Sequence, residues 1–229
     1  MKYVLAALAC LFFIVHLLFL PPELEDIDSV NFALGVRDFD VARHQPHPPG
    51  YPVFIALGKV STAALKAAGV ASAEPRALAL LSALAGTALI PLLFALFRRL
   101  AADDNLAWWA MAVAICSPLL WFTALRPLSD LTGLALAVAA QVCLLAALAK
   151  PANGRAGEPA NENIEISFTG SPVHPFTGCA ALVTGAALCG LAAGVRVQTV
   201  MLTAPLFLAV LIWPPTAPGA LATARSDAL

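Results

Sequence analysis

The sequence predicts an all-α, polytopic membrane protein with about six transmembrane helices and a helical first external loop. Hydrophobic residues make up 60% of the 229 residues and charged residues only 12%, whereas a soluble domain usually has about 25% charged residues. The apolar residues also gather in runs close to the ~20 residues that a helix needs to cross the hydrocarbon core. Because an open strand would leave backbone groups unpaired in lipid, these runs are predicted to be helices.

Six runs that contain no Asp, Glu, Lys or Arg are the predicted spans. They cover residues 4–20, 77–97, 106–125, 131–148, 176–195 and 197–213. Pro91, Pro118 and Pro205 lie inside spans. Neighbouring helices can satisfy the carbonyls that a proline frees, so the prolines are compatible with the assignment.

The predicted membrane domain covers residues 1–213, and its first external loop covers residues 21–76. The first run is predicted to be an uncleaved anchor; a cleaved signal peptide is the alternative, but no small-residue cleavage site follows the run. The Pro-, Ala- and Gly-rich tail at 214–229 is predicted to be disordered. The five cysteines fall in apolar runs without metal-ligand spacing and are predicted to be small hydrophobic residues.

The segment 51–70 differs from the six spans because it carries Lys59 and Lys66. A spacing of seven residues places both lysines on one face of a helix. The pattern predicts a helix from about Pro52 to Ala68 at the membrane surface, with a seventh span as the alternative.

The charged residues argue against a nucleic-acid partner and do not fix the orientation of the chain in the membrane. The net charge of −1 gives no sign of a nucleic-acid partner, which would require a basic face. Lysines and arginines number six on the side of the N-terminus and seven on the other side, so their count does not fix the topology under the positive-inside rule. Arg98 and Arg99, directly after a span, favour a cytoplasmic position for that end.

Polar residues concentrate in the first external loop. Residues 23–50 hold six carboxylates, two arginines and two of the four histidines. A chain that only needs to reverse direction does so in a few residues, so a long loop of mixed charge is predicted to be functional.

An ordered series of motifs resembles the GT-C superfamily of membrane glycosyltransferases, in particular the bacterial protein mannosyltransferases and the aminoarabinose transferases. An acidic string, Asp28-Ser29-Val30-Asn31-Phe32-Ala33, follows the first span; the most specific string, His47-Pro48-Pro49-Gly50-Tyr51-Pro52, comes next. Arg126-Pro127-Leu128-Ser129-Asp130 resembles the second acidic position of the family, and Gly190-Leu191-Ala192-Ala193-Gly194-Val195-Arg196 resembles its glycine-rich turn with one basic residue.

The resemblance implies transfer of a sugar from a polyprenyl-phosphate donor to an acceptor hydroxyl, with inversion, at the external face of a bacterial inner membrane. Asp28 is the implied general base, since a carboxylate can remove the acceptor proton in a single step; Asp26 is its nearest rival. The alternative for Asp28 is the N-cap of a short helix over residues 29–36. An extended stretch is predicted from Pro46 to Pro49, because a residue before proline avoids the helical region.

The remaining site candidates are substrate contacts. His47 and Tyr51 belong to the most specific string, and the alternative for His47 is a solvated loop histidine. Arg196 is a candidate for binding the donor phosphate, or a residue that snorkels to the interface. Arg126 and Asp130 are implied to be site residues, or else pair with each other across their turn.

Cofactor and partner predictions follow from the same residues. No metal signature exists, although the loop carboxylates are ligands suited to a divalent metal, which stays possible. The predicted partners are a lipid-linked sugar donor and membrane lipid. Members of the family usually have further spans, so a catalytically inactive fragment, or an assembly partner for a missing C-terminal half, is the alternative function. A transporter is less favoured because the spans carry no charge.

Overall fold

The structure is a computed structural model that describes residues 2–148 and 176–212. Its elements within these ranges are helices: α1 (Lys2–Leu18), α2 (Ile27–Arg37), the 3₁₀ turn η1 (Val41–Arg43), α3 (Pro52–Ala67), α4 (Ala73–Ala101), α5 (Asp104–Ile115), α6 (Pro118–Thr123), α7 (Asp130–Leu148), α8 (Phe176–Val195), the 3₁₀ turn η2 (Val197–Thr199) and α9 (Val200–Ile212). The all-α prediction is confirmed for this part of the chain. The predicted disordered tail lies outside it.

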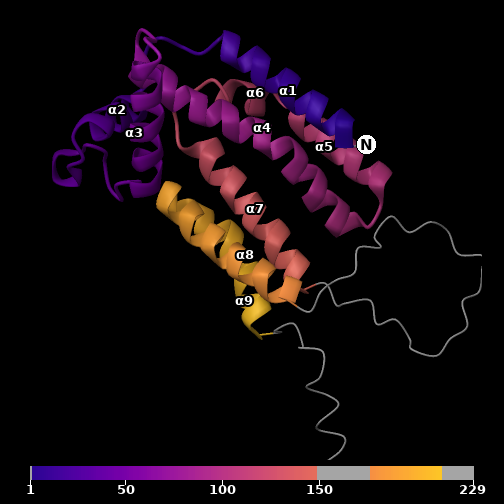
Figure 1. The fold of residues 1–229 in the computed structure, drawn as a ribbon. Helices are drawn as coiled ribbons and strands as arrows, with labels where there is room; N and C mark the ends of the chain where they lie inside the picture. The colour runs from indigo at the N-terminus through magenta and orange to yellow at the C-terminus, as the bar shows by residue number, and fades with distance from the viewer. Residues whose placement is uncertain (1, 149–175, 213–229) are drawn as a thin grey trace, which may run out of the picture.

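The long helices form a bundle, and α2 and α3 sit together at one end of it (Figure 1). Helix α7 contacts α4, α8 and α9, while α4 also contacts α1, α3 and α5. Helices α4 and α7 therefore form the centre to which the other helices attach.

The number of full-length spans differs from the prediction of six. Among the described residues, two helices are long and apolar enough to cross a membrane: α4 and α7. Other apolar stretches of helix lie at Lys2–Leu18, Ala180–Val195 and Val197–Ile212.

The predicted span at 106–125 is not one helix. It is divided between α5, which ends at Ile115, and α6, which begins at Pro118. Ser117, between them, has an extended backbone with a ψ of 126°. A residue before proline disfavours the helical conformation and proline is well placed at a helix start, so the chain breaks here.

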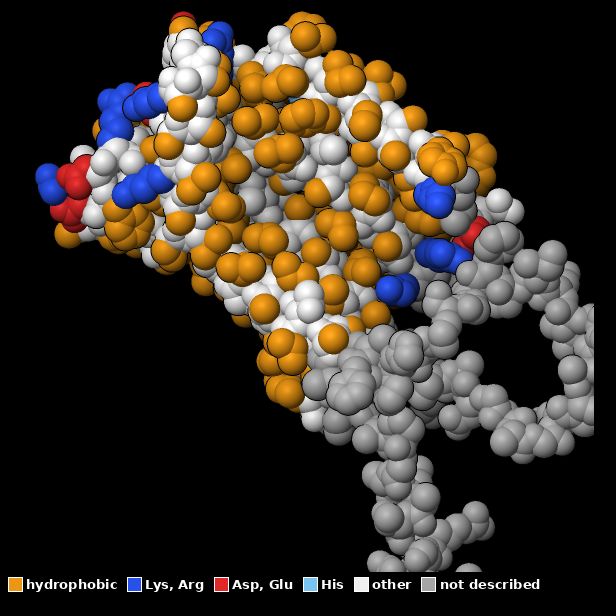
Figure 2. Space-filling model, in the orientation of Figure 1, with side chains coloured by type: hydrophobic (Ala, Val, Ile, Leu, Met, Phe, Trp, Pro, Cys, Tyr) orange, Lys and Arg blue, Asp and Glu red, His pale blue; other side chains and the backbone are white. Residues whose placement is uncertain are grey.

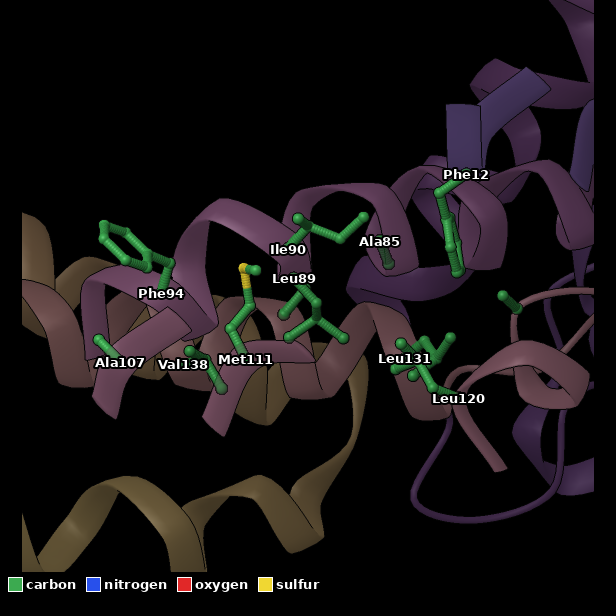
Figure 3. Packing of buried hydrophobic residues seen from close by; sticks show 12 residues of the cluster. Phe12, Ala85, Leu89, Ile90, Phe94, Ala107, Met111, Leu120, Leu131 and Val138 are labelled. Atoms are coloured by element: carbon green, nitrogen blue, oxygen red, sulfur yellow. The ribbon is translucent and has the colours of Figure 1, made fainter. Parts of the chain in front are cut away.

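One hydrophobic core joins α1, α4, α5, α6 and α7. Its buried members include Phe12, Leu89, Met111, Leu120 and Leu131, and Figure 3 shows the cluster spread along α4, from Phe12 on one side to Phe94 on the other. The core brings the α6–α7 turn against the middle of α4.

A second core attaches α2 and α3 to the bundle. Phe32, Phe54, Leu78 and Val195 are buried together. Gly194 allows α8 to approach α3 closely, because a Cβ at this position would lie 2.5 Å from Cγ2 of Val53. The loop helices are therefore packed on α4 and α8.

The outer face of the bundle is apolar between two charged ends (Figure 2). Large hydrophobic side chains that are exposed on the helices of the bundle include Leu11, Ile14, Leu84, Trp109, Val113, Leu119, Phe122, Leu202 and Leu208. At one end, Arg98 pairs with Asp104 at 2.7 Å. At the other end lie the charges of α2 and α3, where Glu74 pairs with Lys66 at 3.0 Å and Arg37 at 3.2 Å. Soluble monomers rarely expose a continuous apolar face of this kind.

The start of α2 corrects the predicted cap. Asp26, not Asp28, is the N-cap: its carboxylate accepts from the Ser29 amide at 2.8 Å. The Ser29 hydroxyl in turn accepts from the Asp26 amide at 3.2 Å, which completes a capping box. Asp28 lies in the first turn of α2.

The segment between α2 and α3 corrects a second prediction. Residues 46–49 form turns instead of an extended stretch, with the Gly50 amide donating to the His47 carbonyl at 3.0 Å. Just before these turns, reciprocal backbone hydrogen bonds between Asp40 and Gln45, at 2.7 and 2.9 Å, close residues 40–45. Gly50 has a φ of +97°, a conformation that favours glycine. Helix α3 then begins at the predicted residue, Pro52, and ends one residue before the predicted end.

Candidate functional site

A polar pocket of about 420 Å³ lies where the start of α2, α6, the turn before α7 and the end of α8 meet. It is lined by Asp26, Ile27, Asp28, Leu119, Thr123, Arg126, Leu128, Asp130 and Arg196. Four of the six predicted site residues therefore line one cavity, although they come from different parts of the chain. The resemblance alone had grouped Asp28, Arg126, Asp130 and Arg196; the structure places them together.

Asp28 is the carboxylate of α2 that remains available. Its side chain is 54% exposed, and it lines the pocket. Its rival Asp26 is occupied, since it caps α2 and accepts from Arg126 Nη2 at 2.7 Å. The structure therefore favours Asp28 over Asp26 as a proton acceptor in the pocket.

Arg126 does not hold its own turn by pairing with Asp130, as one of the two interpretations predicted. Its guanidinium pairs with Asp26 at 2.7 Å and lies 4.0 Å from Glu25. This contact ties the turn between α6 and α7 to the start of α2, across 100 residues of sequence. The ion pair therefore closes one wall of the polar pocket.

Asp130 pairs with Arg196 instead. Arg196 Nη1 lies 3.1 Å from the Asp130 carboxylate and 3.3 Å from the Ser129 hydroxyl, to which it donates. Gly133 allows this approach, because a Cβ there would lie 3.1 Å from the Cβ of Arg196. The second wall of the pocket is thus an arginine held between two side chains of α7 and its turn.

His47 and Tyr51 stand beside Asp28. The Nδ1 atom of His47 lies 3.9 Å from the Asp28 carboxylate, and its Nε2 atom lies 3.2 Å from the Tyr51 hydroxyl. Burial raises the pKa of Tyr51; the positive charge of Arg196 opposes this rise and the charges of Asp28 and Asp130 add to it. Tyr51 is therefore a neutral phenol at ordinary pH. The structure thus gives His47 two polar neighbours, unlike a freely solvated loop histidine.

An apolar groove of about 560 Å³ adjoins the polar pocket. The two cavities share Leu119, Thr123, Asp130 and Arg196. The rest of the groove is lined mainly by the apolar side chains of Leu89, Leu93, Ala114, Leu120, Leu131, Leu134 and Leu202. A charged cavity thus adjoins an apolar one between α4, α6, α7 and α9.

Sequence reasoning missed three parts of this site. The groove residues were hidden among many similar leucines, and no local signal distinguishes them. Ser129 lies within the Arg126–Asp130 string but received no role. Glu25 was considered only as one of the loop carboxylates suited to a metal. In the described residues, no group of three or more His, Cys, Asp or Glu side chains is placed to hold a metal ion.

The arrangement can bind a molecule with an anionic head and an apolar tail. Both arginines keep N–H donors beyond those used on their carboxylates, and guanidinium groups suit phosphate oxygens. Asp28 is placed to accept a proton at the same cavity.

No family model, curated protein or solved structure matches the chain.

Proposed function

We propose that this protein is a multi-pass membrane glycosyltransferase of the GT-C type, which moves a sugar from a polyprenyl-phosphate donor to an acceptor hydroxyl. The observation that carries the proposal is the polar pocket that adjoins the apolar groove. A lipid phosphate has the same two parts, a charged head and a hydrocarbon chain.

The membrane setting is supported by the two long apolar helices and by the apolar face between charged ends (Figure 2). The apolar helices α1, α8 and α9 complete the proposed multi-pass domain. The polar pocket lies at the end that carries α2 and α3, opposite Arg98. Since positive charges favour the cytoplasmic side, the pocket is proposed to face the exterior of a bacterial inner membrane.

In the proposed donor complex, the polyprenyl chain occupies the groove between Leu89, Leu134 and Leu202, and the phosphate lies near Arg196. The sugar then lies in the polar pocket, close to Asp28. Asp130 and Ser129 hold the Arg196 guanidinium in place, so little side-chain freedom is lost when the phosphate binds. Binding of apolar chain and phosphate together positions the anomeric carbon.

The proposed reaction is a single displacement. The Asp28 carboxylate removes the proton of the acceptor hydroxyl, and the acceptor oxygen attacks the anomeric carbon. The bond between this carbon and the phosphate oxygen breaks, and polyprenyl phosphate leaves with the bonding electron pair. Arg196 stabilises the charge on the leaving phosphate. Attack from the face opposite the leaving group inverts the configuration.

The test is a transfer assay with the full chain in lipid nanodiscs, using radiolabelled polyprenyl-phosphate sugars and a panel of hydroxyl acceptors. Asp28→Asn keeps the shape of the side chain and removes its basicity, so the rate is expected to fall by about 10²- to 10⁴-fold. Asp38→Asn is the matched control: its carboxylate is also exposed, at 63%, and is not among the residues that line the pocket. It should transfer at the wild-type rate.

Two results would oppose the proposal. Near-normal transfer by folded Asp28→Asn would remove Asp28 as the base. Absence of transfer by the wild-type chain with every donor would remove the activity itself, and then the arrangement of the pocket would need another ligand.

A further inference from the structure

Three side chains form a line from the polar pocket into the second core: Asp28, His47 and Tyr51. The histidine is the middle member, with Nδ1 at 3.9 Å from the Asp28 carboxylate and Nε2 at 3.2 Å from the Tyr51 hydroxyl. The Nδ1 atom is buried and has no hydrogen-bond partner in the structure. A neutral imidazole carries one N–H and one lone pair, so the direction of each contact depends on where the proton lies.

The phenol decides the direction of the inner contact. Tyr51 is 6% exposed and its ring packs edge-on against Phe32, with ring centroids 5.0 Å apart. Its backbone has a φ of +47° at the start of α3, and burial of the ring restricts its movement. A phenol can donate or accept; by donating its O–H to the Nε2 lone pair of His47, the buried Tyr51 hydroxyl gives its hydrogen an acceptor.

The carboxylate decides the outer contact. If Nε2 carried the proton, the lone pair of Nδ1 would face the Asp28 carboxylate across 3.9 Å, and two regions of negative charge would be adjacent. If Nδ1 carries the proton, an N–H points toward the carboxylate, which is favourable. A charge-assisted N–H···O bond is about 2.7–2.9 Å long, so a movement of about 1 Å by the exposed Asp28 side chain completes the bond.

We propose that Tyr51 fixes His47 in the Nδ1–H tautomer, so that His47 donates to Asp28 and aims its free carboxylate oxygen into the polar pocket. His47 and Tyr51 are positioning residues in this assignment, which rests on the proposed function of Asp28. Sequence analysis had placed both of them in contact with substrate.

The contact has a clear consequence for the proposed reaction. A base that accepts a hydrogen bond on one oxygen keeps the other oxygen directed toward the acceptor hydroxyl. Hydrogen bonds to a charged group are among the stronger ones, so removal of the imidazole N–H is expected to slow transfer by about tenfold or more. Removal of the phenol O–H acts through the tautomer and leaves the imidazole in place.

The tautomer can be measured without an activity assay. The full chain is labelled with ¹⁵N-histidine and placed in nanodiscs at mildly alkaline pH, where an ordinary histidine is neutral. The ¹⁵N chemical shifts of the ring then distinguish a protonated from an unprotonated nitrogen. The chain has four histidines, and the signal absent from His47→Gln belongs to His47.

The expected result is an Nδ1–H signal for His47 in the wild type and a shift toward the Nε2–H form in Tyr51→Phe. Tyr3→Phe is the matched control, because Tyr3 is the other tyrosine, is 77% exposed and lies in α1; it should leave the signal unchanged. An Nε2–H signal, or two protonated nitrogens, in the wild type would overturn the proposal, as would an unchanged tautomer in Tyr51→Phe. If the tautomer is found but no donor is turned over, the contact stands and the transferase function falls.

Discussion

Asp26 and Asp28 lie two residues apart at the start of α2 but have different roles: Asp26 caps the helix, and Asp28 is the proposed base. Asp26 accepts from the Ser29 amide at 2.8 Å and from Arg126 at 2.7 Å. Asp28 makes neither contact, and its side chain is 54% exposed. Replacement of Asp26 by Ala should therefore loosen α2, whereas replacement of Asp28 by Ala should not.

The magnitude follows from the contacts that are lost. Loss of an N-cap costs about 1 kcal/mol. The ion pair of Asp26 with Arg126, whose side chains are 26% and 43% exposed, adds at most about 1 kcal/mol because solvent screens it. Asp26→Ala is thus expected to destabilise α2 by about 1–2 kcal/mol, a factor of roughly 5–30 in its opening equilibrium.

Two further variants separate the contribution of the helix cap from that of the ion pair with Arg126. Asp26→Asn keeps a good cap residue and removes the charge, so it should cost no more than about 1 kcal/mol. In Asp28→Ala, the higher helix propensity of alanine offsets the lost attraction between an acidic side chain and the helix N-terminus. Its effect should stay within about 0.5 kcal/mol.

Hydrogen exchange followed by mass spectrometry measures the opening directly. The peptide that covers α2 should exchange roughly 5- to 30-fold faster in Asp26→Ala than in wild type, in nanodiscs and under conditions where exchange follows the opening equilibrium. Equal acceleration in Asp28→Ala would refute the assignment of the cap. It would also restore the prediction from sequence that Asp28 begins the helix.

Two other outcomes are expected. In a cysteine-free background, single cysteines at the exposed positions Asp38 and Asn105 should react with a membrane-impermeant maleimide from opposite sides of the membrane; reaction of both from one side would contradict the proposed topology. Ion pairs with Lys66 and Arg37, Lys66 being the larger cause, lower the pKa of Glu74 below its ordinary value. The stability that Glu74 contributes to the junction of α2, α3 and α4 is therefore complete above the ordinary glutamate pKa and is lost as the pH falls through the lowered pKa. Glu74→Gln should remove this part of the acid dependence from a thermal unfolding series in detergent, and an unchanged acid dependence would show that other groups cause it.

Local chemistry let the sequence predict several elements closely. Helix α3 was predicted from about Pro52 to Ala68 and is observed at Pro52–Ala67. A proline at the first turn and a run of apolar and small residues are signals that lie within the helix itself. The aspartates and Ser29 also predicted a capped helix after the first run, although the choice between Asp26 and Asp28 needed the structure. Two cap candidates so close together differ mainly in which partner each one reaches.

The number of membrane-spanning helices could not be predicted from local sequence alone. Hydropathy identifies apolar residues but does not record whether they continue one helix, so the break at Ser117 was missed. The turn at 47–50 was likewise missed; a hydrogen bond from the Gly50 amide to the His47 carbonyl closes it. In both places the backbone takes a conformation that the pattern of apolar residues does not reveal.

By itself, the sequence determined the helical class, the apolar composition and the concentration of charge in the first loop. Only the tertiary structure decided the partners of the two arginines: Arg126 turns away from Asp130 to Asp26, and Arg196 takes Asp130. It also decided that the apolar groove adjoins the polar pocket. The physical reason is that short-range periodicity specifies which residues are helical and which are charged. Ion pairs between segments as far apart as 100 residues depend on how glycines, side-chain volumes and helix breaks let the helices pack.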